Sequence, residues 1–406
     1  MSLLHMLSEA GCWESFYRYK CSLACPKQFA KELRAFIDSQ GYLPVCGRIS
    51  RGEAFPLPER SVISKQGRDK KRVVYIYPKA ENTVLKLLTH LMLRHYDGIF
   101  APGLYSFRPG RTAQQAFRSL ANTPGIGEMY SYKADISNYF NSVDISLLLP
   151  VLERVTADDP ELYSFLRSLL CEPRVLERGV PLTESKGIMA GTPLSAFYAN
   201  LFLSELDRRF AEKGVPYARY SDDIILFSPD RRELDDLASE VRDHLAQRGL
   251  TLNPEKESFT SPGEKWVFLG LSCEGGTVDI APASVTKLKA RMRRKTRALD
   301  RWQQRSGAGR ESAAKAFIRI FDRKLFEAGA DNELSWAHWY FPVINTDQSL
   351  RLLDAYAQDC LRFLLSGRRT KSRYSVRYGQ LKALGYRSLV HEYYLRINAA
   401  NRDKDG

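Results

Sequence analysis

The sequence has no long apolar run and no leader-like beginning. None of its segments reaches the roughly 18 consecutive apolar residues of a membrane-spanning helix, so we expect no membrane partner. The first residues, MSLLHMLSEAGCWESF, lack the basic region and the apolar core of a secretory signal. The seven cysteines are odd in number and scattered, which indicates reduced thiols and not a disulfide framework. These absences favour a cytoplasmic protein.

Zinc-site spacing and internal repeats are also missing. Cys21 and Cys25 lie four positions apart, but no second Cys or His pair follows at the spacing of a zinc site. We therefore interpret both cysteines as core or incidental residues. Without repeats or low-complexity tracts, a chain of 406 residues with 44% hydrophobic residues suits two or three ordinary globular domains.

Acidic residues are too few to balance the basic ones. The chain has 61 Lys and Arg against 47 Asp and Glu, a formal net charge of +14. The excess is concentrated between residues 285 and 325, where 14 basic residues meet three acidic ones. A solvated helix face would explain a typical charge run, but a long run of one sign favours contact with a nucleic-acid backbone. Its densest part consists of Arg291, Arg293, Arg294, Lys295 and Arg297.

Hydrophobic periodicity divides the chain into a mixed part and a helical part. β-Branched and aromatic runs predict strands at 70–78, 129–136 and 266–273, and a hairpin at 217–228. Apolar residues at helical spacing predict helices at 8–20, 26–40, 81–97, 145–170, 193–211 and 231–249. We interpret the stretch 43–68, rich in Pro and Gly, as a loop. From 283 onward the pattern predicts an almost wholly helical, basic segment.

Two predicted strand segments in the mixed part carry aspartates. Asp135 ends the first, and Asp222 and Asp223 lie between the two runs of the hairpin. An adjacent acidic pair is usually a solvated turn, but like charges repel and Asp disfavours strands, so apolar strands on both sides make that explanation poor. Phosphodiester synthesis uses two divalent ions about 3.5–4 Å apart, and hard cations prefer carboxylate oxygens. The three aspartates are therefore candidate ligands of a two-metal site.

Short motifs around these aspartates resemble those of reverse transcriptases. The family's YxDD box is similar to YSDD at 220–223, and its first catalytic box is similar to DISNYF at 135–140. The box between them resembles MAGTPLS at 189–195, and a finger segment of group II intron and retron enzymes resembles SFRPGR at 106–111. The two boxes that follow resemble LNPEK at 252–256 and FLG at 268–270. All six motifs occur in the family's order, within about residues 70–272.

This resemblance implies an α+β fold of the right-hand polymerase type, with fingers, an antiparallel-sheet palm and a helical thumb. It places an N-terminal extension at 1–60, fingers at 61–133, a palm at 134–274, a basic helical thumb at 275–370 and a C-terminal tail at 371–406. Within the palm range, residues 145–186 are expected to form helices on the fingers side. No nuclease motif, zinc ribbon or RNase H constellation follows residue 272.

The resemblance also implies roles for individual residues. Asp135, Asp222 and Asp223 would be catalytic, and together with Ile136 they would form the site of two Mg²⁺ ions, for which Mn²⁺ can substitute. Nucleotide contacts are expected from Lys71, Arg72, Phe140, Gly191, Ser195 and Lys256. Nucleic-acid contacts are expected from Arg108, Arg111, Arg291, Arg293, Arg294, Lys295 and Arg297.

Four of the nucleotide residues have specific expected tasks. Arg72 would hold the triphosphate, and Gly191 would let the backbone approach the template and nucleotide. Lys256 would lie near the leaving pyrophosphate, where a cation stabilises developing charge. Phe140 would lie under the sugar and exclude a 2′-hydroxyl; the alternative is a core aromatic residue.

The chain most resembles bacterial defence-associated reverse transcriptases. This resemblance rests on the segments at 190–196 and 381–394 and on the compact length of the chain. Among these enzymes, the second type copies its RNA into concatenated DNA and is the nearest in resemblance. This implies a structured non-coding RNA as template and scaffold, dNTPs as substrates and a cDNA product in anti-phage defence. Ala190 replaces a Gln that many relatives have, which keeps template-independent DNA synthesis open. An intron maturase and a non-catalytic RNA-binding protein are further alternatives, and the oligomeric state stays open.

Overall fold

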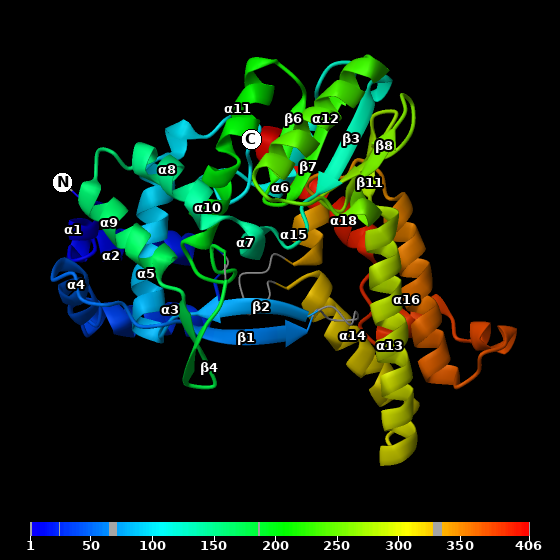
Figure 1. Ribbon diagram of the computed structural model, residues 1–406. Coiled ribbons are helices and arrows are strands. Elements are labelled where there is room, and N and C mark those ends of the chain that lie inside the picture. Colours follow the sequence, from blue (N-terminus) through cyan, green and yellow to red (C-terminus); the bar gives the residue numbers. More distant parts are fainter. Residues whose placement is uncertain (1, 24, 65–70, 186, 328–334, 406) are drawn as a thin grey trace. The chain divides into compact units, whose positions relative to one another are not determined.

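The computed structural model consists of two compact units, Met1–Pro262 and Gly263–Gly406. It describes residues 2–23, 25–64, 71–185, 187–327 and 335–405, with only the backbone described at 64, 71 and 400–405. Figure 1 labels the elements within each unit. Residues 263–274, expected in the palm, fall in the second unit.

The first unit begins with helices around a buried tryptophan. They are α1 (Leu3–Met6), α2 (Ala10–Ser22), α3 (Lys27–Asp38), α4 (Leu43–Ser50) and α5 (Lys79–His95). Trp13 is fully buried, and its ring stacks on that of Tyr42 with the centroids 4.8 Å apart. The predicted loop at 43–68 is therefore wrong over α4, because Val45 is buried in this core and Pro44 suits the first turn of a helix.

Two hairpins form a four-stranded sheet in the same unit. The strands β1 (Glu59–Ser64), β2 (Lys71–Ile76), β4 (Arg174–Glu177) and β5 (Val180–Thr183) lie in the order β2-β1-β4-β5. Each hairpin is antiparallel, and a parallel contact between Glu59 and Leu176 joins them. Residues 174–183 thus form strands, and the expectation of helices over 145–186 is met only by α8 (Ile145–Val155) and α9 (Pro160–Cys171).

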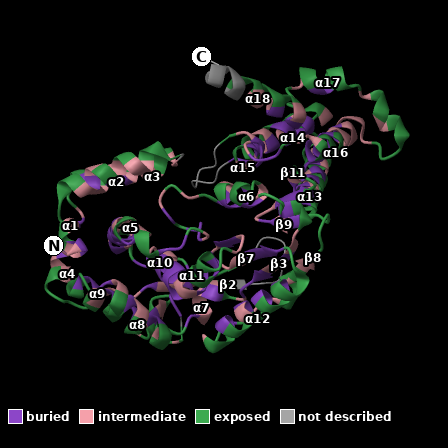
Figure 2. Ribbon diagram, turned by 90° about the horizontal axis from the view of Figure 1, so that it is seen from above, coloured by how far each residue is buried: buried purple, intermediate pink, exposed green. Residues whose placement is uncertain are grey.

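A second four-stranded sheet in this unit contains the acidic segments. The strands β3 (Tyr130–Asp135), β6 (Tyr217–Tyr220), β7 (Asp223–Ser228) and β8 (Ser258–Thr260) are antiparallel in the order β6-β7-β3-β8. This confirms the strand predicted at 129–136 and the hairpin predicted at 217–228. Helix α12 (Arg231–Gln247) packs against β3 and β7, and Figure 2 shows these strands among buried segments.

Short helices connect the two sheets of the first unit. They are η1 (Asp97–Ile99), α6 (Ala113–Ala121), η2 (Ile126–Glu128), α7 (Tyr139–Ser142), α10 (Ser195–Phe202), α11 (Ser204–Glu212) and η3 (Pro254–Lys256). The single helix predicted at 193–211 is divided at Leu203, whose φ of −109° and ψ of 11° depart from helical values. Both halves remain buried through Phe197 and Phe210.

The second unit combines a small sheet with a set of helices. Its antiparallel sheet has the order β11-β10-β9, with β9 (Trp266–Phe268), β10 (Leu271–Glu274) and β11 (Thr277–Ile280). The single strand predicted at 266–273 is wrong because the chain turns at Leu269 and Gly270, which have φ of 49° and 83°.

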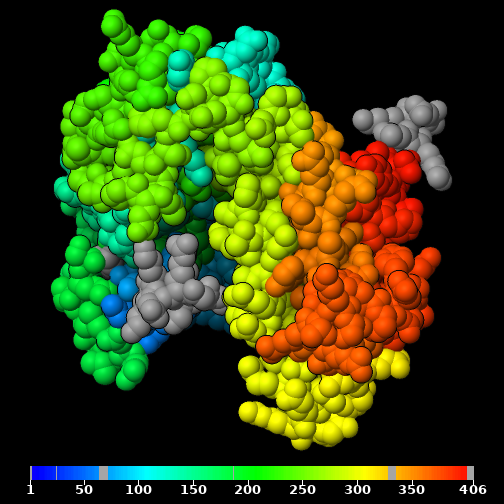
Figure 3. Space-filling model, turned by 90° about the vertical axis from the view of Figure 1, so that its right-hand side faces the viewer, coloured from blue at the N-terminus to red at the C-terminus, as the bar shows by residue number. Residues whose placement is uncertain are grey.

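The helices of this unit confirm the helical pattern predicted from 283 onward within the described residues. They are α13 (Pro282–Ser306), α14 (Arg310–Leu325), α15 (Trp336–Tyr340), α16 (Gln348–Ser366), η4 (Lys371–Ser375), α17 (Tyr378–Ala383) and α18 (Leu389–Asp405). Helices α13 and α16 pack along each other, and Figure 3 shows their neighbouring outer surfaces. None of the helices that the structure describes has the length and apolar character to cross a membrane.

Candidate active site

Strands β3 and β7 place acidic residues opposite each other. Asp135, the last residue of β3, is the register partner of Asp223, the first residue of β7. The N–H of Ile136 donates to the carbonyl of Asp222 at 2.9 Å, so the segment after β3 also holds the hairpin turn. On the other side, the N–H of Asn253 donates to the carbonyl of Asp135 at 2.8 Å. The ends of both acidic strands are therefore fixed by backbone hydrogen bonds.

The turn between β6 and β7 consists of Ser221 and Asp222, because Tyr220 pairs with Asp223. Ser221 has a φ of +60°, a left-handed conformation that few non-glycine residues adopt. Such a conformation costs on the order of 1–3 kcal/mol and persists where surrounding contacts determine it. The turn that presents Asp222 thus needs support from the protein below it.

A buried arginine supplies this support. The Nη1 group of Arg219 donates to the Ser221 carbonyl at 3.1 Å, and its Nη2 group donates to the carbonyl of Asn200 at 3.2 Å. Asp207 of α11 accepts from Nε at 2.7 Å and from Nη2 at 2.6 Å. Both ion-pair partners have no exposed side-chain surface. The Tyr217 hydroxyl donates to the same carboxylate at 2.7 Å.

The sequence patterns missed this residue pair. A charged residue inside the β-prone run YARY at 217–220 was the available signal, because an arginine in a buried strand requires a counter-ion. That the counter-ion is Asp207 follows only from the packing of α11 against β6. We assign Arg219 as a positioning residue for the turn and not as a catalytic residue.

The acidic residues are electrostatically crowded. Burial raises the pKa of Asp222, and the charge of Asp135 raises it further. Burial, with the neighbouring Asp222 charge, raises the pKa of Asp223 to about 6. Lys256 of η3 offsets part of this repulsion, since its ammonium group lies 2.5 Å from Asp135 Oδ2. Its predicted place near a pyrophosphate stays a prediction, whereas its contact with a predicted metal ligand is direct.

These carboxylates fit a divalent ion by their chemistry. No three His, Cys, Asp or Glu side chains in the described residues come together as a ready-made metal site. Magnesium, however, commonly takes only one or two protein carboxylates and completes its shell with water and substrate phosphates. Asp135 and Asp222 offer hard oxygen ligands of this kind, and their mutual repulsion would be relieved by a cation.

The backbone around Gly191, a predicted nucleotide contact, is held between β2 and α7. The N–H of Tyr75 donates to the Ala190 carbonyl at 2.8 Å, and the N–H of Ile188 donates to the Phe140 carbonyl at 2.9 Å. Gly191 has a φ of +101°, and a Cβ there would lie 3.2 Å from the Tyr75 carbonyl oxygen. The backbone at Gly191 therefore comes close to strand β2 of the protein itself, and its approach to a nucleotide remains a prediction.

Phe140 belongs to an aromatic group beside the acidic turn. The ring centroid of Phe107 lies 6.4 Å from that of Phe140 and 6.5 Å from that of Tyr220. Phe140 is only half-buried, and Phe107 is 40% exposed with a φ of +58°. Phe107 was not singled out in the sequence, although it lies in the SFRPGR motif. Together these rings form a partly exposed apolar surface next to the carboxylates.

Arg72 is an exposed cation of β2 that acts on the acidic turn. Its charge is one of the influences that lower the pKa of Asp222, against the larger effect of burial. This places a positive charge of the first sheet within electrostatic reach of the second. The side chain of Lys71 lies outside the described residues.

The placement of Arg108 lends no support to its predicted nucleic-acid contact, which stays a prediction. Its side chain is 5% exposed and forms a two-pronged ion pair with Asp97 at 2.7 and 3.0 Å. It also donates to the carbonyl of Ala101 at 2.7 Å. The guanidinium group is directed inward because these acceptors occupy it, so Arg108 fixes the loop between α5 and α6.

Ser195 is likewise occupied within the protein, whereas Arg111 is partly available. The Ser195 hydroxyl donates to the Thr192 carbonyl at 2.6 Å and the residue is buried, so its predicted nucleotide contact gains no support and stays a prediction. Arg111 donates to the Pro102 carbonyl at 2.9 Å and keeps part of its surface exposed.

The remaining predicted nucleic-acid residues share one helix of the second unit. All five occur on α13, and four of them are exposed: Arg291, Arg293, Arg294 and Arg297. None of the five forms an ion pair with a carboxylate that the structure describes. The charges of these five residues are therefore not neutralised by ion pairs with the described carboxylates.

The first unit thus presents facing aspartates at a hairpin turn of an antiparallel sheet, beside a partly exposed aromatic group. The family model "Reverse transcriptase (RNA-dependent DNA polymerase)" matches residues 63–273, about half of the chain. The chain belongs to this family, whose members use divalent metal ions, and membership indicates an RNA-directed DNA polymerase. The predicted fold class is confirmed. No curated protein has a significant sequence match.

Solved structures similar to the chain include three yeast telomerases. Apo telomerase from Candida tropicalis truncated from its C-terminal domain is 14% identical with a TM-score of 0.44, over 55% of each chain. Apo telomerase from Candida tropicalis is 11% identical with a TM-score of 0.47, over 85% of this chain and 73% of the other. Telomerase from Candida albicans in complex with a TWJ fragment of telomeric RNA is 12% identical, with a TM-score of 0.44 over 83% and 64%. The chain spans little more than half of the first structure.

Proposed function

We propose that the chain is a Mg²⁺-dependent RNA-directed DNA polymerase that copies an associated structured non-coding RNA into cDNA. The observation that carries this proposal is the pairing of Asp135 with Asp223 beside the Ser221–Asp222 turn. We further propose membership of the bacterial group II intron and retron lineage and a role in anti-phage defence. The motif at 190–196 and the resemblance of the chain's end at 381–394 support this assignment.

The residues of the site divide the chemical work. Asp135 and Asp222 would hold the ions, with Asp223 assisting and Ile136 beside them. When bound, two Mg²⁺ ions lower the pKa of the primer 3′-hydroxyl and stabilise the charge of the leaving pyrophosphate. Lys256 would balance and orient the Asp135 carboxylate, with which it forms an ion pair.

The surrounding elements would seat the substrates. Arg72 would hold the triphosphate, since it is exposed and its charge reaches Asp222. Phe140 would contact the sugar from the aromatic group beside the turn. In this proposal the sheet β2-β1-β4-β5 belongs to the fingers, the sheet β6-β7-β3-β8 to the palm, and α13–α16 to the thumb. The unpaired charges of α13 support an RNA partner.

The test is the nucleic acid that co-purifies with the full chain, sequenced as RNA and as DNA. We expect DNA complementary to one structured RNA. Replacement of the site acids, Asp222→Asn with Asp223→Asn, should reduce dNTP incorporation by about 1,000-fold or more, since bound metal ions lower the activation barrier by several kcal/mol. The matched control is Asp235→Asn with Asp236→Asn, an exposed acidic pair on α12, which should retain activity.

Other outcomes would identify the alternatives. DNA of random sequence would indicate template-independent synthesis, which Ala190 keeps open. Splicing of an adjacent intron would indicate a maturase. Full phage protection by the Asp222→Asn, Asp223→Asn variant would indicate that the chain acts in defence as a non-catalytic RNA-binding protein, and it would refute a polymerase-dependent defence role.

A further inference from the structure

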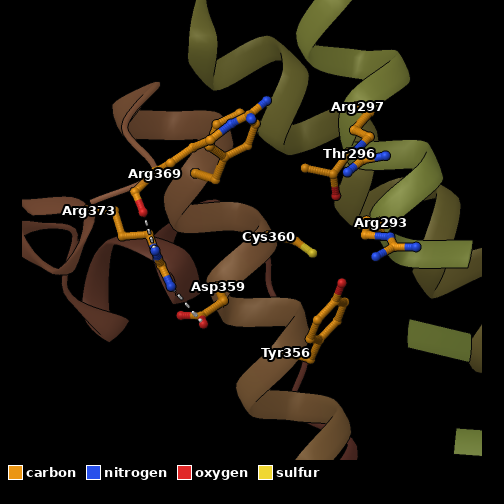
Figure 4. Close-up of a pocket in the computed structure, with 9 residues that line it drawn as sticks. Arg293, Thr296, Arg297, Tyr356, Asp359, Cys360, Arg369 and Arg373 are labelled. Carbon is orange, nitrogen blue, oxygen red and sulfur yellow. Dashed lines mark hydrogen bonds and ion pairs between the residues drawn. The ribbon is translucent and has the colours of Figure 1, made fainter. Parts of the chain in front are cut away.

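The second unit contains an arginine-lined cavity of about 300 Å³. Arg293 and Arg297 of α13 line one side, and Arg369 and Arg373, which follow α16, line the other. Figure 4 shows Arg293 and Arg297 on one side of this space and Arg369 on the other, with Arg373 directed toward Asp359 of α16. The cavity is thus lined by four positively charged side chains and one negatively charged side chain.

The single carboxylate is already occupied. Asp359 accepts from Arg373 at 3.2 Å and from Arg362 at 3.5 Å. Among the described residues, no carboxylate forms an ion pair with Arg293, Arg297 or Arg369. Cations that lie close together without carboxylate partners repel each other, and an anion bound between them relieves this repulsion. Guanidinium groups bind phosphate oxygens with charge-assisted hydrogen bonds that are stronger than neutral ones.

Aromatic residues give the cavity a second kind of contact. Tyr356 and Phe363 of α16 contribute to its lining. The Arg369 guanidinium lies 5.6 Å from the Phe363 ring centroid, and Lys289 lies 5.8 Å from that of Tyr356. Bases of single-stranded nucleic acids stack on aromatic rings and on guanidinium planes. The volume is at the lower end of small-ligand sites, which span about 300–1,000 Å³, and suits one nucleotide.

We propose that this cavity binds one phosphate-bearing nucleotide, and that the nucleotide is part of a single-stranded RNA. The polymer is favoured over a free nucleotide because positive charge continues along α13 beyond the cavity, at Arg291 and Arg294. An extended phosphodiester chain can contact both the cavity and this continuation, whereas a mononucleotide cannot. The identity of the polymer as RNA rests on the proposed function, but the cavity lies in a different unit from the acidic site.

The first experiment measures binding of a 12-nucleotide oligouridylate to the full chain at several salt concentrations. Replacement of the α13 side, Arg293→Gln with Arg297→Gln, should raise Kd about tenfold by removing two charge-assisted contacts. The dependence of log Kd on log salt should fall by about 0.7 if one phosphate contact is lost. Arg291→Gln with Arg294→Gln is the matched control, since it removes the same charge from the same helix outside the cavity. It should raise Kd only about two- to threefold. Equal losses for the two pairs would overturn the proposal in favour of a uniformly charged helix face.

The second experiment tests whether the two sides act on one ligand. Arg369→Gln with Arg373→Gln should weaken binding as much as the α13 pair, and all four replacements together should weaken it little further, because one ligand site is lost once. Additive losses would overturn a shared site. Thermal unfolding shows whether each variant is folded. If the loss of Arg373 disturbs η4, the α13 pair still tests the proposal, because its two arginines are exposed and form no ion pair with a described carboxylate.

Uridine monophosphate and inorganic phosphate distinguish the source of the phosphate. We expect both to compete with the oligonucleotide only at far higher concentration. Competition by uridine monophosphate at an equal nucleotide concentration would refute the polymer. If the wild-type chain makes templated cDNA but the cavity variants bind oligouridylate as well as the control variant, this inference alone is refuted. If the cavity variants lose oligouridylate binding selectively but the wild-type chain makes no DNA, the proposed function alone is refuted.

Discussion

Removal of the buried Arg219–Asp207 ion pair should have separable effects on stability and activity. In Asp207→Ala the arginine charge remains fully buried without its carboxylate. Removing one partner of a buried pair typically costs about 3–5 kcal/mol. Since free energies of unfolding are usually 5–15 kcal/mol, we expect this variant to be severely destabilised.

A double replacement removes both charges together. Asp207→Leu with Arg219→Met puts apolar side chains where the ion pair was, an exchange that is often neutral or stabilising. We therefore expect part of the stability to return, because the buried Tyr217 hydroxyl also loses its acceptor in Asp207→Leu. The Ser221 carbonyl, however, loses the donor at 3.1 Å that supports its left-handed turn. A hydrogen bond to a charged group contributes about 1.5–3 kcal/mol, so primer extension should stay reduced by about 10- to 100-fold.

Urea unfolding measures the first effect, and primer extension at a temperature where all variants are folded measures the second. Glu212→Ala, which removes an exposed ion pair with Arg208 on the same helix, is the control and should match the wild type in both assays. Full activity of the double variant would refute the positioning role of Arg219. Equal instability of the double and single variants would refute the buried-charge argument.

Gly187→Ala should destabilise the first unit and lower activity, because its Cβ would lie 2.5 Å from the Phe140 carbonyl oxygen; Gly179→Ala, with the same sign of φ but open space, controls for backbone strain alone, and equal unfolding midpoints would contradict the clash. Phe140→Ala should increase incorporation of ribonucleotides relative to deoxynucleotides in parallel extension assays, and unchanged discrimination would remove its predicted gate role. Burial, with the nearby Arg248 charge, lowers the pKa of His244 to about 4. The folded state thus disfavours protonation of His244, so the contribution of this neutral imidazole to the free energy of unfolding should be fully present above about pH 6.5. The free energy of unfolding should decline between pH 6.5 and 4, more steeply in the wild type than in His244→Gln in urea titrations at each pH.

The strands and the acidic turn were predictable because their signals are local. The β-prone runs on both sides of Asp222 and Asp223 occur within twelve residues, and β3 has the same character. The order of the motifs then indicated that Asp135 belongs with them. The register that places Asp135 opposite Asp223 is a consequence of pairing between distant segments, and only the structure supplies it.

Side-chain roles were predicted less well because they depend on partners elsewhere in the chain. Arg108 lies in a motif associated with nucleic-acid contact, but Asp97 is close enough to bind it. Ser195 begins a helix, where its hydroxyl finds the Thr192 carbonyl. The strands β4 and β5 were missed because each has only four residues, and the hairpin that they form joins a sheet through β1, a segment distant in sequence.

The central position of β3 also has a consequence for how the chain folds. Its two neighbours, β7 and β8, follow it in sequence, and the register partners Asp135 and Asp223 are 88 positions apart. Contacts of such long sequence separation form slowly, because closing the loop costs entropy before strand pairing stabilises the structure. During synthesis β3 leaves the ribosome with both edges unpaired until residues 223–260 follow. The group of three aspartates is consequently among the last features of the first unit to assemble, and shorter nascent chains carry Asp135 without the other two.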